Sequence, residues 1–192
     1  HDVGKALNPM FFIENQPQGQ MNAHDDMDPA QAAATIIAHV TDGVALARQY
    51  RLPRRIDDFI LEHHGTMITR YQFNKDIEAA GGNASKVDKE NFRYPGPRPR
   101  SRETALLMLA DGVEARARAE RPQDEEALRK VVLSTIESAQ KQGQFDNTQL
   151  TLRDLSIITE SFVNVLRGTH HPRVSYPKEE SAVTNVLTAP RK

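Results

Sequence analysis

Apolar residues recur at helical spacing along this chain, and no segment alternates apolar and polar residues as a strand would. After Asp28-Pro29, a pair that favours a helix start, apolar side chains follow one another three or four positions apart to about Tyr50. Further helices are expected over residues 53–64, 102–120, 123–142 and about 152–167. The pattern therefore predicts an all-α fold.

Proline and glycine divide the helical segments. Residues 8–28 hold two prolines and several amides, which predicts a long ordered loop. A flexible excursion is expected around residues 76–91, and the three prolines at 95, 97 and 99 indicate an extended strap. We expect one domain over residues 1–177 and a disordered tail over 178–192.

Composition excludes several kinds of protein. The 192 residues contain no cysteine, so disulfides and thiolate metal sites are excluded. The net charge of −1 gives no indication of binding to a nucleic-acid polymer. The longest fully apolar run, residues 105–110, is too short to cross a bilayer, and no signal peptide is visible. Because the chain opens without methionine, we expect a fragment of a longer protein.

Histidine and aspartate residues form the pattern that carries chemistry. Each candidate lies on or at the end of a predicted helix beside apolar residues: His1, Asp2, His39, His63, His64 and Asp111. Imidazole and carboxylate ligands without sulfur suit manganese, iron or zinc. Six such ligands are too many for one tetrahedral ion and suit two ions about 3.5–4 Å apart. This arrangement predicts the hydrolysis of a phosphoester.

Taken singly, these residues have plainer interpretations. The pair at 63–64 is more often a polar helix end, and it binds one site only if Gly65 turns the chain in a left-handed conformation. Asp111 could pair with an arginine, and His39 alone would be a residue at the edge of the core. His24 lies among aspartates and is expected to be solvated rather than a ligand.

The motifs resemble those of the HD-domain metal-dependent phosphohydrolases. A more specific similarity is to the catalytic domain of the seven-transmembrane HD family, in six blocks: HDVGK at 1–5, FFIENQ at 11–16, HHGT at 63–66, FRYPGPRP at 92–99, LADGVEA at 109–115 and HPRVSYP at 171–177. This resemblance implies an HD-domain helical bundle that hydrolyses cyclic-di-AMP to linear pApA. It further implies a cytoplasmic domain, with any membrane attachment through an upstream region outside this chain, and a possible homodimer.

The resemblance also implies roles for individual residues. Asp2 would bridge two manganese or iron ions, with His1 and Asp111 on the first ion and the histidines at 39, 63 and 64 on the second. Lys5 would lie near the scissile phosphate as a positive charge or proton source. Relatives carry one further histidine on a preceding helix, which the printed sequence lacks, so the first ion has one ligand fewer here.

Aromatic and basic residues near the strap are candidate substrate contacts. The aromatic candidates for stacking on adenine are Tyr71, Phe73 and Tyr94, which could equally pin the excursion to the body. Arg93, Arg98 and Arg173 are candidate phosphate ligands. Two other functions stay open: hydrolysis of another nucleotide, and nucleotide or metal binding without turnover. A cyclic-di-GMP enzyme is expected to carry Gly-Tyr-Pro after the histidine pair, and residues 66–73 contain no such motif.

Overall fold

The computed structural model describes residues 1–17, 24 and 26–170. Within them the chain forms six α-helices and several short 3-10 helices, and its one β-type contact is an isolated bridge between Ile68 and Arg93. The helices are α1 (Pro29–Gln49), α2 (Arg54–Glu62), α3 (Arg70–Ala79), α4 (Arg102–Glu120), α5 (Glu125–Lys141) and α6 (Leu152–His170). The expected all-α fold is confirmed.

Side-chain caps explain where these helices begin. The Asp28 carboxylate accepts a hydrogen bond from the backbone N–H of Gln31, with Pro29 in the first turn of α1. Ser101 and Thr104 form a reciprocal capping box at the start of α4. Both starts were predicted from the sequence and are confirmed.

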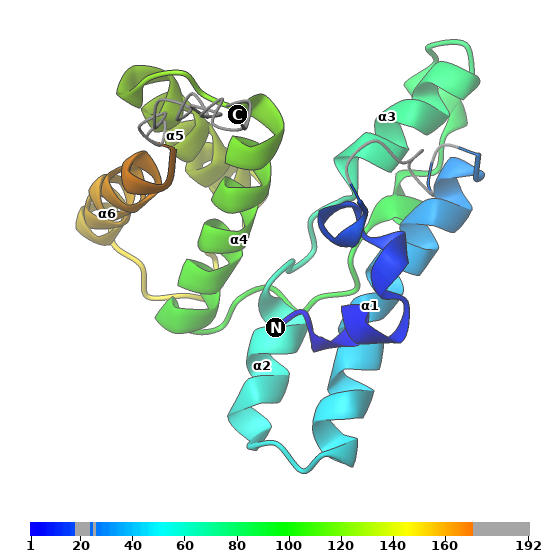
Figure 1. Cartoon of the computed structure of the whole chain (residues 1–192), viewed down its shortest axis with the longest axis horizontal. Helices are drawn as coiled ribbons and strands as arrows, with labels where there is room; N and C mark the ends of the chain where they lie inside the picture. The colour runs from blue at the N-terminus through cyan, green and yellow to red at the C-terminus, as the bar shows by residue number, and fades with distance from the viewer. Residues whose placement is uncertain (18–23, 25, 171–192) are drawn as a thin grey trace, which may run out of the picture.

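The helices form two groups that meet at α4 (Figure 1). The first group consists of α1, α2 and α3 together with the 3-10 helix η1 (Val3–Leu7), which lies against α1. The second consists of α4, α5 and α6, whose core contains Leu109, Val132 and Val163. Helix α4 contacts α2 in the first group and α5 in the second. It therefore lies where residues from both groups can share one site.

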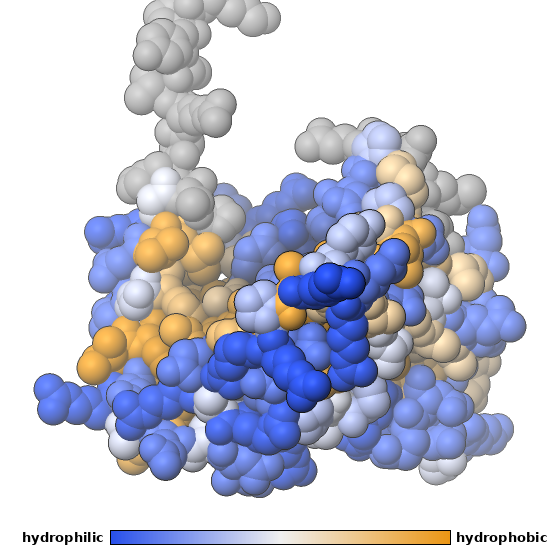
Figure 2. Space-filling model, turned by 90° about the horizontal axis from the view of Figure 1, so that it is seen from below, coloured by the Kyte–Doolittle hydropathy of each residue, from blue (hydrophilic) through white to orange (hydrophobic). Residues whose placement is uncertain are grey.

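Three details of the helices and loops extend or correct the sequence-based expectations. The segment around 76–91 holds the end of α3 and two 3-10 turns, η4 (Ala84–Lys86) and η5 (Lys89–Phe92), and the last of these residues is fully buried. The apolar run at 105–110 is not covered on all sides, because Leu106 is 41% exposed. Leu106 lines an apolar groove between α4 and α6, and apolar side chains gather on that part of the molecule at the left of Figure 2.

Helix α1 is the one described helix that is long and apolar enough to cross a membrane by length and composition. Only 39% of its most apolar window is buried, yet it contacts η1, α2 and α3. A core helix meets the same criteria, so this is weak evidence for a membrane span.

Candidate metal centre

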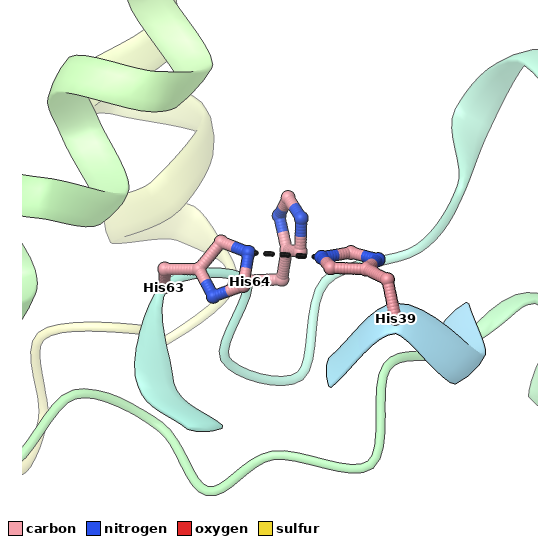
Figure 3. A group of neighbouring side chains, drawn as sticks. All are labelled: His39, His63 and His64. Carbon is pink, nitrogen blue, oxygen red and sulfur yellow. Dashed lines mark hydrogen bonds between the residues drawn. The ribbon is translucent and has the colours of Figure 1, made fainter. Parts of the chain in front are cut away.

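The histidines of α1 and the end of α2 face one another across the first group of helices. His39 Nδ1 lies 2.5 Å from the carbonyl oxygen of Ile36, and His63 Nδ1 lies 2.7 Å from that of Ile60. Because each Nδ1 must donate to its carbonyl, the neutral rings keep a lone pair on Nε2. These two Nε2 atoms are 3.1 Å apart (Figure 3). Two lone pairs at that distance repel unless a proton or a metal ion lies between them.

His64 completes this first cluster. Gly65 has φ +51°, which confirms that the chain turns in the left-handed conformation directly after the pair. The His64 ring lies 3.9 Å from the His63 ring and 4.1 Å from the Tyr94 ring, on which it stacks. One nitrogen from each of the three histidines falls within 4.8 Å of the others. The tertiary structure therefore brings His39, His63 and His64 into one donor cluster.

Two histidines of the cluster, His39 and His64, favour the uncharged form. Burial lowers the pKa of His39, and neighbouring His63 lowers it further. Burial lowers the pKa of His64 well below its usual value, with additional effects from His63 and His39. Neutral imidazole is the form that binds metals.

A second cluster lies beside the first. It is formed by His1, Asp2 and Asp111, whose donor atoms are also within 4.8 Å of one another. His1 Nε2 is 3.2 Å from Asp2 Oδ2 and 3.6 Å from Asp111 Oδ1. Hydrogen bonding to Asp111, and then to Asp2, raises the pKa of His1 to about 9. Two carboxylates at this position thus favour a positive charge between them.

Asp2 connects the two clusters. Its Oδ2 faces His1, whereas its Oδ1 lies 3.5 Å from His39 Nε2 and 3.6 Å from His63 Nε2. Oδ1 is buried and, within the described residues, is the one buried side-chain polar atom without a hydrogen-bond partner. Burial would raise the pKa of this carboxyl, but His1, His63 and Lys5 outweigh it and hold the pKa well below its usual range. An unpartnered carboxylate oxygen aimed at two imidazole lone pairs fits a metal ion.

Close backbone contact fixes Asp2 against α1. A Cβ atom on Gly4 would lie 1.9 Å from the carbonyl oxygen of His39 and 2.6 Å from the backbone nitrogen of Gly43. Only a glycine pair at this crossing lets η1 lie directly on α1. The glycine of the HDVGK motif therefore sets the distance between the two ligand clusters.

Lys5 is a fixed positive charge at the edge of the clusters. Its Nζ is 2.9 Å from Asp2 Oδ2 and 2.6 Å from Glu14 Oε1. Burial would lower the pKa of Lys5, but the hydrogen bonds to Glu14 and Asp2 raise it above its usual value. Glu14 was not predicted as a site residue: it lies in the FFIENQ block, but the resemblance of that block was not taken to imply a role for it.

A cleft of about 740 Å³ opens beside the clusters, between the two groups of helices. His64, Asp111 and two predicted substrate contacts, Tyr71 and Tyr94, line it. Arg70 and Arg116 also line it and were missed, since only the fold brings α3 and α4 to the same cleft.

The other predicted substrate contacts do not line this cleft. Phe73 packs against Phe92, and Arg93 pairs with Glu90. Arg98 donates to the carboxylate of Asp146, in the loop after α5. Arg173 lies outside the described residues, as does the expected tail over 178–192.

His24 corrects one expectation. It is 4% exposed rather than solvated, with Nε2 2.6 Å from the carbonyl oxygen of Phe11 and its ring stacked on that of Phe11. The amide of Gln72 lies 3.3 Å from its Nδ1. The neighbouring aspartates in the sequence predicted a solvated ring. The prediction is wrong because the ring turns inward and contacts aromatic and amide groups from other segments.

Comparison with known proteins gives consistent matches. The model of the HD domain family matches residues 1–116. The chain is 36% identical over 95% of its length to the cyclic-di-AMP phosphodiesterase PgpH of Bacillus subtilis, and 39% identical over 99% to the protein slr0104 of Synechocystis sp.. It spans 25% and 23% of the lengths of these relatives.

A solved structure resembles the fold closely. The crystal structure of the L. monocytogenes phosphodiesterase PgpH HD domain in complex with cyclic-di-AMP superimposes with a TM-score of 0.81. The two chains are 31% identical, over 92% of this chain and 79% of the other.

Proposed function

The chain belongs to the HD domain family, and from this premise we propose that it is a metal-dependent phosphodiesterase that hydrolyses cyclic-di-AMP to linear pApA. The observation that carries this proposal is the position of Asp2 between two donor clusters beside a cleft. The relatives named as cyclic-di-AMP phosphodiesterases, and the similar HD domain in complex with cyclic-di-AMP, support the choice of substrate.

The two clusters divide the six proposed ligands between two ions, manganese or iron. His39, His63 and His64 would hold one ion, and His1 and Asp111 the other, with Asp2 shared. When bound, two such ions activate water and balance the charge of phosphoryl oxygens during in-line attack. The donor set fits this role, because the two carboxylate oxygens of Asp2 face different clusters.

Residues around the clusters have proposed roles in holding the substrate. Lys5, fixed by two carboxylates, supplies a positive charge near the reacting phosphate rather than a mobile proton. Tyr71, which is half-exposed, offers an aromatic face in the cleft for adenine, whereas the buried ring of Tyr94 stacks on His64. Arg70 and Arg116 lie in the same cleft, where guanidinium groups suit the second phosphate.

The whole protein's organisation also belongs to this proposal. Because the chain spans about a quarter of the relatives it matches, attachment to a membrane through another region and homodimer formation stay predictions. Membrane attachment through another region would place this domain on the cytoplasmic side of the membrane.

The decisive experiment is a product analysis. The chain is incubated with cyclic-di-AMP and Mn²⁺, and the products are separated by chromatography. We expect pApA, and EDTA should abolish its formation. Cyclic-di-GMP and deoxynucleoside triphosphates serve as parallel substrates. Cleavage of one of these without any pApA would contradict the choice of substrate, and metal binding without any hydrolysis would favour a non-catalytic signalling role.

A further inference from the structure

His64 differs from the other two histidines of its cluster in how its ring is held. His39 and His63 each place Nδ1 on a backbone carbonyl, which fixes the ring. Within the described part of the chain His64 forms no such bond; its Nδ1 lies 3.8 Å from Asp111 Oδ2, and its ring stacks on Tyr94. The orientation of this ring therefore depends on the backbone turn at Gly65 and Thr66.

A residue from the second group of helices holds that turn. Gln144 follows Gly143, which has φ +66° directly after Gln142, the C-cap residue of α5. The backbone N–H groups of Gly143 and Gln144 donate to the carbonyls of Gln140 and Ala139, the pattern of a Schellman motif. Gln144 is thus anchored to α5 through its backbone, and its side chain is 1% exposed.

The Gln144 side-chain amide forms two hydrogen bonds with Thr66. Its Oε1 accepts from the Thr66 backbone N–H at 3.0 Å, and its Nε2 donates to Thr66 Oγ1 at 3.0 Å. A Cβ atom on Gly65 would lie 2.2 Å from Gln144 Oε1, so the amide can approach only because residue 65 is glycine. Arg93 holds the same turn by donating to the Thr66 carbonyl at 2.8 Å.

We propose that Gln144 is a positioning residue that holds the turn at Gly65 and Thr66 and thereby aims the His64 ring into the metal cluster (the cluster is drawn in Figure 3). It links the second group of helices to the histidines of the first. This inference rests on the proposed function of the cluster as a metal site. A backbone carbonyl fixes the ring orientation of the other two histidines. For His64 this orientation would depend on Gln144, which lies 80 positions further along the chain.

The test measures Mn²⁺ binding to the full chain by the electron paramagnetic resonance signal of free Mn²⁺. Gln144→Met keeps the volume of the side chain and removes both hydrogen bonds. We expect binding about 10-fold weaker, as for other residues that orient a metal ligand. Gln140→Met, the same change at an exposed position of α5, is the control and should bind as the wild type does.

A double-mutant cycle separates positioning from general structural support. In a His64→Ala background, Gln144→Met should weaken binding by less than about 2-fold, because its effect acts through the missing ring. An equal loss in both backgrounds, or wild-type affinity in Gln144→Met, would overturn the proposal. Thermal unfolding without metal shows whether each variant is folded.

Thr66→Val tests the same contact from its other end. It removes Oγ1 and keeps the backbone N–H, and we expect binding about 3-fold weaker. If Gln144→Met does not fold, wild-type affinity in Thr66→Val overturns the proposal. Because the readout is Mn²⁺ binding, a failure to hydrolyse cyclic-di-AMP would contradict the proposed function and not this inference. A wild-type chain that binds no Mn²⁺ would overturn both.

Discussion

At the scale of single residues, Asp2 is the group that we propose is shared by the two clusters. Its Oδ1 is buried without a partner, between imidazoles that present lone pairs. We predict that Asp2→Asn weakens Mn²⁺ binding and lowers the rate of hydrolysis by more than about 100-fold, since the loss should exceed that of an orienting residue. Metal content and product formation are the measurements.

Asp26→Asn is the matched control, because this exposed aspartate lies outside both clusters. It should retain full activity. Wild-type metal content and rate in Asp2→Asn would contradict the shared role of Asp2.

Among individual histidines, only the combined pattern in the sequence separated the proposed ligands from the other histidines. His39 and His24 are both buried, at 2% and 4% exposure, yet only His39 faces other donors. Its position on the helix beside the buried stripe could be predicted, because helical spacing places it there. The burial of His24 could not, since its partners, Phe11 and Gln72, lie 13 and 48 residues away in sequence.

At the scale of helices, Glu62 connects the end of α2 to the start of α4 through hydrogen bonds. This carboxylate is 1% exposed. It accepts hydrogen bonds from Arg100 Nε at 2.7 Å, from the Arg100 backbone N–H at 2.9 Å and from Thr104 Oγ1 at 2.6 Å. The residue after Glu62 is His63, and α4 carries Asp111, so the same contact sets the distance between ligands from two helices.

We predict that Glu62→Gln lowers the free energy of unfolding by about 1–3 kcal/mol, because a buried hydrogen-bonded charge is replaced while Arg100 stays partly solvated. Urea unfolding followed by circular dichroism measures this. Glu103→Gln, at an exposed ion pair with Arg55, should leave the free energy of unfolding close to that of the wild type. Equal effects of the two changes would contradict the role assigned to Glu62.

At the scale of the whole molecule, the two donor clusters draw residues from both groups of helices. Asp111 comes from α4, whereas the other five proposed ligands belong to the first group. Binding should therefore stabilise the folded chain as a unit. We predict that Mn²⁺ at about 100 times its Kd raises Tm by about 5–10 °C, and that EDTA reverses the change. Differential scanning calorimetry measures the shift.

Asp111→Asn should reduce this shift, whereas Glu114→Gln, at an exposed position of the same helix, should leave it unchanged. No rise in Tm with Mn²⁺ in the wild type would contradict metal binding between the groups.

The sequence by itself determined where most of the described helices lie, because caps such as Asp28 and Ser101 and the spacing of apolar residues act locally. It also indicated the six candidate ligands, since their types and order resemble a family pattern. Only the tertiary structure decided which ligands share a cluster, which arginines line the cleft and that Gln144 holds the turn after His64. These relations depend on packing between helices that are distant in sequence, and a local sequence pattern does not specify such contacts.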